Sequence, residues 1–173
     1  MKVIRKVEQE TNWEEIREKV RAGQFTPGDE IEIDGALWRV LDSKAGDVFI
    51  WKHTGIEQAV AFNGNGSNEY EGSNIQAYAR GEFLNEVPPE LKALVSEQGF
   101  FPLSIDEVRR YLPTEGDRIA VDDGGETVWW WTRSANRSYA TNVWYVIASG
   151  YVGSYYGASN AHRFAPACHL TAI

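Results

Sequence analysis

The last 47 residues of the chain, 127–173, contain no Asp, Glu, Lys or Gln, although the chain as a whole is acidic. They form short apolar and aromatic runs, including TVWWWTRS, NVWYVIA, YVGSYY and HRFAPACHL, separated by Ser, Gly and Asn. Such runs, bounded by residues that favour turns, predict β-strands. The chain is therefore expected to end in a series of short strands, which favours a compact, loop-rich fold over a helical bundle.

Strands and helices before residue 127 are expected in separate blocks. The Asp34-Gly35 pair is a hairpin-turn signal between two strand-like runs. Ser104 and Glu107 have the spacing of a capping box, which predicts a helix that Pro113 ends. The strands are predicted at 31–33, 37–41 and 47–51, and the helices at 73–84, 88–95 and 104–112. Because βαβ alternation is nearly absent from this order, the sequence predicts the α+β class.

The N-terminal segment is predicted to carry a helix of its own. Thr11 with Glu14 has the capping-box pattern, and Trp13, Ile16 and Val20 recur at helical spacing. We expect residues 1–25 to be a helical attachment segment and residues 26–173 to form the main domain.

The charge of the chain is uneven. The last 47 residues carry only three Arg and no acid, hence +3, so the formal charge of −8 leaves −11 on the first 126. An acidic chain is a poor partner for phosphate backbones, so we expect no nucleic acid ligand. The start has no apolar signal region and no stretch reaches transmembrane length, which predicts a protein made in the cytoplasm that does not insert into membranes.

Catalytic and metal-binding patterns are missing from the sequence. Cys168 is the single cysteine, so neither a disulfide within the chain nor a paired-cysteine metal site can form. His53, His162 and His169 lie far apart, and no serine-elbow, phosphate-loop or HExxH motif occurs. The loop with Asn65, Asn68 and Glu69 either chelates a cation or is an ordinary structured loop, and we favour the loop. We predict a protein that is not an enzyme and has no cofactor or metal.

Tyrosine is concentrated in the uncharged C-terminal part. Five of the eight Tyr lie between residues 139 and 156, among Ser, Asn and Gly. This composition is typical of antibody-like binding surfaces, where Tyr supplies rigid contact area and small polar residues supply adaptable hydrogen bonds. The alternative is ordinary packing, because Tyr also favours strands. We favour binding, since plain solvent-facing strands rarely lack charge.

Two further features have both a structural and a functional interpretation. Trp129-Trp130-Trp131 is either a stacking platform or, as we favour, core residues plus one surface ring, because neighbouring strand residues face opposite ways. Arg133 either contacts a ligand carboxylate or, as we favour, bonds loop carbonyls inside the framework.

Several stretches together resemble a known family. They are LWRVLD, YEGSNIQAYARGEFLNE, FPLSIDEVRRYL, WTRSA at 131–135 and RFAPAC at 163–168. In this order they resemble proteins with a C-type-lectin-like fold of the sulfatase-modifying-factor type, and more narrowly the variable proteins of diversity-generating retroelements. The resemblance covers roughly residues 26–173. It implies that a retroelement rewrites a variable region at about 135–162, mainly at Asn codons.

The resemblance implies a hypervariable protein that binds a protein or glycan ligand on a host cell surface, in a phage tail or another virion-associated assembly. The calcium-binding motifs of related lectins (Glu-Pro-Asn, Gln-Pro-Asp, Trp-Asn-Asp) are absent. In NVWYVIA, strand alternation places Tyr145 and Ile147 on one face and Trp144 on the other. The displayed, ligand-binding residues are expected to be Tyr139, Tyr145, Ile147, Tyr151, Ser154, Tyr155, Tyr156, Gly157, Asn160 and His162.

Two other functions stay open at this point. The tyrosines form a permanent subunit interface if the protein is an assembly module. An enzyme of the formylglycine-generating type is the other alternative, and the single Cys168 argues against it, because those relatives depend on a pair of cysteines.

Overall fold

Two five-stranded sheets, one two-stranded sheet, five short α-helices and one 3₁₀ turn (Gly116–Arg118) make up the part of the chain that the computed structural model describes, residues 11–155 and 157–173. This is a mixed α+β fold with antiparallel sheets, as the sequence predicts. The helices are α1 (Trp13–Ala22), α2 (Asn74–Arg80), α3 (Glu82–Glu86), α4 (Pro89–Leu94) and α5 (Ile105–Tyr111). The strands are β1 (Glu30–Ile33), β2 (Ala36–Lys44), β3 (Asp47–Lys52), β4 (Ala59–Ala61), β5 (Phe101–Pro102), β6 (Ala120–Val121), β7 (Thr127–Val128), β8 (Trp130–Ala135), β9 (Val143–Val146), β10 (Val152–Gly153), β11 (Ala161–Arg163) and β12 (Pro166–Thr171).

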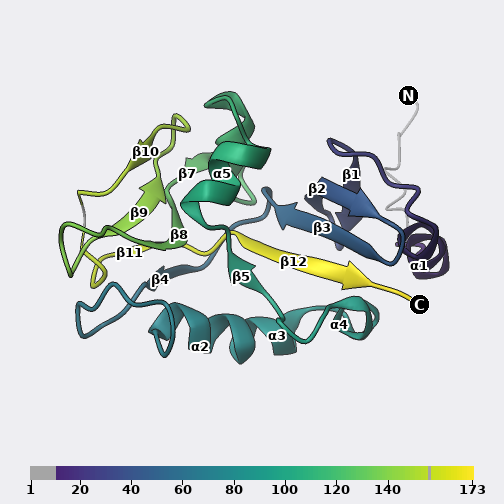
Figure 1. The fold of residues 1–173 in the computed structure, drawn as a ribbon, viewed down its shortest axis with the longest axis horizontal. Helices are drawn as coiled ribbons and strands as arrows, with labels where there is room; N and C mark the ends of the chain where they lie inside the picture. Colours follow the sequence, from purple (N-terminus) through teal and green to yellow (C-terminus); the bar gives the residue numbers. More distant parts are fainter. Residues whose placement is uncertain (1–10, 156) are drawn as a thin grey trace, which may run out of the picture.

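The two sheets occupy opposite halves of the molecule (Figure 1). The first has the strand order β1-β2-β3-β12-β5 and is antiparallel throughout. The second has the order β10-β9-β8-β11-β4, with one parallel pairing between β11 and β8. Helices α2, α3 and α4 lie along one side of both sheets, and α5 lies on the other side (Figure 1).

Strand β8 separates two hydrophobic cores. Trp131 belongs to a first core with Trp38, Ile50 and Phe62, whereas Trp130 belongs to a second core that includes Trp51. Both Trp130 and Trp131 are 0 % exposed. Two of the three rings are therefore core residues, as expected, whereas Trp129 is half-buried against the first core and is only partly a surface ring.

Local signals set most element boundaries. The Asp34-Gly35 turn has positive φ angles of 51° and 79°, as a tight hairpin between β1 and β2 requires. The predicted capping box at Ser104 and Glu107 is present at the start of α5. The predicted helix at 73–84 is interrupted, because Gly81 leaves helical geometry (ψ −95°) and the chain starts α3 immediately afterwards.

Helix α1 is part of the main fold rather than a separate attachment. Its buried residues Ile16 and Val20 lie in the first core, and the carbonyl of Val20 accepts a bond from the backbone of Gly46, between β2 and β3. The expected cap at Thr11 is wrong: Asn12 caps the helix through Glu15, and the Thr11 hydroxyl donates to the carbonyl of Glu32 instead. Residues 1–10 of the predicted attachment segment lie outside the described residues.

The turn between β9 and β10 packs tightly against the loop that follows α5. A Cβ atom added to Gly150 would lie 1.9 Å from the carbonyl oxygen of Glu115, and Gly150 has φ 89°. Gly125 has a similar φ of 80° but open space around the same position. The two glycines therefore have similar φ angles and differ in what a Cβ atom would contact.

We expect Gly150→Ala to reduce the free energy of unfolding by at least about 2 kcal/mol more than Gly125→Ala, because only the first change forces backbone atoms apart. Urea unfolding of the two variants measures this difference. Equal losses would show that the turn moves freely away from Glu115.

Candidate binding surface

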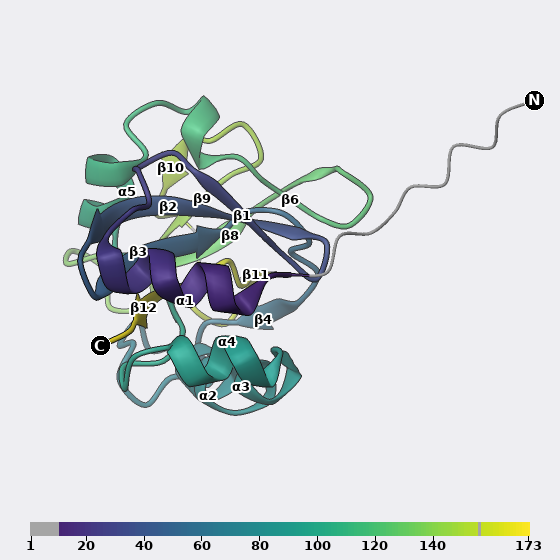
Figure 2. The ribbon, with the colours of Figure 1, turned by 90° about the vertical axis from the view of Figure 1, so that its right-hand side faces the viewer.

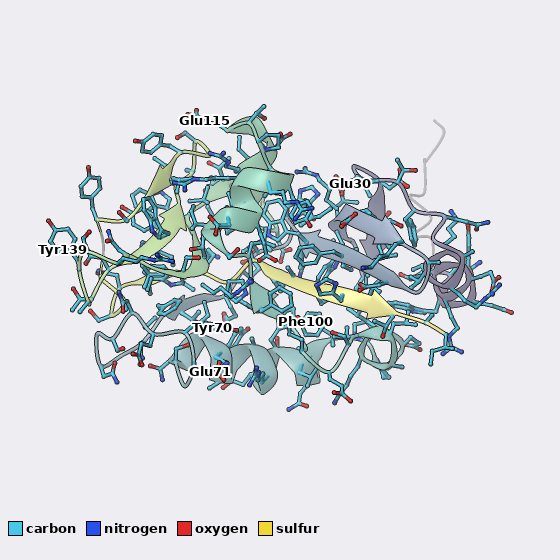
Figure 3. The ribbon with its side chains drawn as sticks, viewed as in Figure 1. Glu30, Tyr70, Glu71, Phe100, Glu115 and Tyr139 are labelled. Atoms are coloured by element: carbon cyan, nitrogen blue, oxygen red, sulfur yellow. The ribbon has the colours of Figure 1, made fainter. Side chains whose placement is uncertain are left out.

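Three tyrosines are exposed in the C-terminal part of the chain. Tyr139 is 64 % exposed, Tyr151 59 % and Tyr155 87 %. Figure 3 shows Tyr139 at the end of the molecule that lies farthest from α1. All three lie on connections between strands of the second sheet, and exposed apolar area gathered on one part of a surface marks an interaction site. We refer to Tyr139, Tyr151 and Tyr155 as the tyrosine face.

The loop that carries Tyr139 is held by Asn68 from a distant part of the sequence. The side-chain amide of Asn68 donates to the carbonyls of Asn136 and Tyr139 at 3.0 Å and of Asn142 at 3.1 Å. Its backbone N–H also donates to the carbonyl of Ala140 at 3.1 Å. Four contacts from one residue thus hold the loop 136–142, whereas most surface loops of this length have no such support and are more mobile.

Further bonds join this loop to the segment that carries Tyr155. The Asn136 side chain donates to the hydroxyl of Ser154 at 3.1 Å, and the backbone of Ala158 donates to the carbonyl of Thr141 at 2.7 Å. Asn142 also forms an isolated bridge with Gly157. The two segments therefore form one connected support for the tyrosine face.

Tyr145 is a correction to the predicted display set. It is 2 % exposed and its ring stacks on Trp129, with centroids 5.6 Å apart and an interplanar angle of 10°. The prediction failed because both faces of β9 are covered: Tyr145 lies in the first core and Val146 in the second, while Trp144 stays half-buried under Arg109.

The buried Tyr145 still contributes to the surface from beneath. Its hydroxyl accepts a bond from the backbone N–H of Tyr155 at 3.2 Å. A Cβ atom at Gly153 would lie only 2.9 Å from that hydroxyl, so the ring fits under β10 because residue 153 is glycine. Tyr145 is thus a positioning residue for Tyr155.

His162 is half-buried within the same aromatic cluster. Its ring centroid lies 4.4 Å from that of Trp131 and 5.3 Å from that of Tyr145. Burial disfavours the charged imidazolium and lowers the pKa of His162 from 6.5 to about 4. At neutral pH His162 is therefore an uncharged ring at the floor of the surface.

The other predicted display residues are less uniform. Asn160 is exposed, and its side chain donates to the carbonyl of Gly157 at 3.1 Å. Ile147 is half-buried and packs against the first core, and Ser154 and Gly157 are also half-buried. Tyr156 lies outside the described residues.

The arginines of the last 47 residues are mostly occupied within the fold. Arg133 donates to the carbonyl of Pro102 at 2.8 Å and pairs with Glu107, which matches the favoured framework interpretation. Arg163 donates to the carbonyls of Ile56 and Glu57. Arg137 is exposed in the loop of Tyr139, so it adds a positive charge to that loop.

Reactive and metal-ligating groups do not converge in the part of the chain that is described. No three His, Cys, Asp or Glu side chains there could hold a metal ion together. His53 bonds Glu30 and His169 bonds Asp47, each at 2.8 Å. Cys168 is fully buried, which raises the pKa of its thiol and suppresses the reactive thiolate. Among the described helices none is long and apolar enough to cross a membrane.

The comparisons with known proteins reach only part of the chain. Residues 98–172 match the model of a protein family described as a domain of unknown function, DUF6273. This match runs from the approach to β5 through β12 and so includes the tyrosine face. No curated protein and no solved structure matches the chain.

Asn68 and Gly153 are the two supporting residues that sequence reasoning missed. The loop of Asn68 is rich in Asn and Gly, which shows that it turns but not which distant carbonyls it meets. Gly153 interrupts a tyrosine-rich run, and an isolated glycine within a strand pattern is a signal for close approach of another group.

We expect Asn68→Ala to lower the free energy of unfolding by about 1–3 kcal/mol, because it removes the side-chain N–H groups from which the carbonyls of the loop 136–142 accept hydrogen bonds. Amide hydrogen exchange should accelerate at residues 136–142. The matched control is Asn65→Ala, since within residues 11–155 and 157–173 the Asn65 side chain bonds only the nearby backbone N–H of Ser67. Equal exchange in the two variants would contradict a bracing role for Asn68.

The pKa of His162 predicts a pH dependence of stability. Because the pKa is lower in the folded chain than in the unfolded one, the unfolded chain binds the extra proton between pH 6.5 and about 4. The contribution of neutral His162 to the free energy of unfolding is thus fully present above pH 6.5 and is lost as the pH falls from 6.5 to about 4. We expect His162→Phe, which cannot titrate, to lose less stability between pH 7 and pH 5 than the parent chain.

Urea unfolding at the two pH values measures this difference. All other groups that bind protons are the same in both chains, so their contributions cancel in the comparison. Parallel losses in the two chains would mean that His162 accepts a proton readily in the folded state.

Proposed function

We propose that this chain is a non-enzymatic ligand-binding protein that uses the tyrosine face to capture a protein or glycan ligand on a host cell surface. One observation carries the proposal: Tyr139, Tyr151 and Tyr155 are each more than half exposed on segments whose backbones are hydrogen-bonded to the framework. Large rings that point into solvent contribute little to folding and expose apolar area to water. A binding function best explains why they are exposed.

The physical basis is contact area without reorganisation. A tyrosine ring has few rotatable bonds, so ordering it on binding costs little conformational entropy. The support from Asn68 and Tyr145 limits backbone movement of the segments that carry Tyr139 and Tyr155. Affinity then comes from shape and ring contact, with little loss to loop ordering.

We further propose a C-type-lectin-like fold of the sulfatase-modifying-factor type and diversification of residues 135–162 by a retroelement. The proposal is supported by the separation of residue types in this region. Tyr139, Tyr151, Tyr155 and Asn160 are exposed, whereas Val143, Val146 and Ala158 of the same region are buried, so side chains can vary above a constant interior. Tyr145 no longer belongs to the proposed variable set, because it is buried.

A place on a phage tail or another virion-associated assembly follows by analogy with that family. Many copies on one particle would raise a weak single-site affinity through avidity. A template repeat near the gene that differs from codons 135–162 only at adenines would identify the retroelement.

A display library tests the binding function. We expect randomising Arg137, Tyr139, Tyr151, Tyr155 and Asn160, all exposed, to leave the chain folded and to yield binders to an unrelated probe protein such as lysozyme. The matched control randomises five exposed positions elsewhere: Arg80, Glu82, Asn85, Glu97 and Gln98. A similar number of binders from both libraries would contradict a dedicated surface.

The triple variant Tyr139→Ala, Tyr151→Ala, Tyr155→Ala separates ligand capture from assembly. Ligand capture predicts that light scattering gives the same mass for the variant and the parent chain. A parent oligomer that dissociates in the variant would instead identify the tyrosine face as a subunit interface.

A further inference from the structure

A groove of about 550 Å³ lies between α1 and α4. Its apolar lining includes the half-buried ring of Trp13 together with Ala93 and Leu94 of α4. This volume is in the range of sites that accept a large side chain or a small ligand. The groove is independent of the tyrosine face, because α1 and α4 lie at the other end of the molecule (Figure 1), side by side in Figure 2.

The rim of the groove carries three charged side chains that form no ion pair within the described residues. Glu14, Arg17 and Glu90 line it, and none of them takes part in an ion pair there. The other acids of α1 differ, since Glu15 pairs with Lys19 and Glu18 pairs with Arg21. The rim thus carries Glu14 and Arg17 from α1 and Glu90 from α4, which is one more carboxylate than guanidinium.

This arrangement favours a basic occupant. A lysine or arginine of a ligand would meet Glu14 or Glu90 at the rim, while an adjacent apolar side chain would pack on Trp13. A second copy of this chain fits poorly, because two rims with an excess of carboxylate would face each other on molecules of formal charge −8.

We propose that the groove between α1 and α4 binds a segment of a partner protein in which an apolar side chain is flanked by basic residues. The apolar side chain fills the space against Trp13 and Leu94, and the basic residues bind Glu14 and Glu90. A partner held there leaves the tyrosine face at the opposite end free, so the groove serves as a point of attachment.

Nuclear magnetic resonance of the full chain labelled with ¹⁵N tests this inference through the indole N–H of Trp13, which Trp13→Phe assigns. The probe is the peptide acetyl-GKLFKG-amide. The matched peptides acetyl-GELFEG-amide and acetyl-GKSSKG-amide lack the basic and the apolar groups respectively. We expect the Trp13 resonance to titrate with the first peptide only, while the resonances of buried Trp130 and Trp131 stay in place.

The charge requirement is tested with two double variants of equal net charge. Glu14→Gln with Glu90→Gln should weaken binding about fivefold, the effect of losing two exposed ion pairs. Glu15→Gln with Glu18→Gln, which leaves the rim intact, should weaken it less than twofold. Both pairs of positions are exposed, so the fold is retained.

Four outcomes would overturn the proposal. They are no Trp13 shift with millimolar basic peptide, equal or tighter binding of the acidic peptide, and equal weakening by the two double variants. The fourth is a shift of the Trp13 resonance without peptide. A shift with rising protein concentration would assign the groove to a second copy of the chain. A shift on changing Lys2, Arg5 and Lys6 to Gln would assign it to the chain's own N-terminal segment.

Discussion

Burial of β8 on both of its faces is the constraint on which the rest of the structure depends. Trp130 and Trp131 point into different cores, and each indole N–H donates to a carbonyl of another segment, that of Arg118 at 3.0 Å and that of Val60 at 2.9 Å. The pair therefore fixes the position of β8 relative to the helices, to β4 and to the loop after α5. Because β9 pairs directly with β8, the surface at this end inherits that position.

Short chains of contacts connect the exposed tyrosines to β8 and its neighbours. Trp129 and Trp131 support the ring of Tyr145, and the hydroxyl of Tyr145 receives the backbone N–H of Tyr155. On the other side, Asn68 supports the loop of Tyr139 from a segment that precedes α2. Rigid core and exposed rings are thus joined by short contacts, which is the arrangement that preorganised binding requires.

Local chemistry made much of the fold predictable. Residues close in sequence determine the Asp34-Gly35 turn, the capping box of Ser104 and the series of short strands, without a described helix between them, at the C-terminus. The burial of Tyr145 was not predictable from the alternation of side chains along β9, because a strand with a core on each face has no side that faces solvent. The bracing by Asn68 was equally hidden, since its partners lie about 70 residues away. The ligand, the lectin-like fold and the variable positions remain predictions.

The bonds made by Asn68 end on main-chain oxygens, not on side chains. Every residue type except proline presents the same backbone, and even proline retains the carbonyl. The brace consequently places no demand on the identity of residues 137–141. A loop held in this manner can change its side chains from one sequence to the next and keep its path, so natural variation there would alter the exposed chemistry of the loop while leaving folding almost untouched.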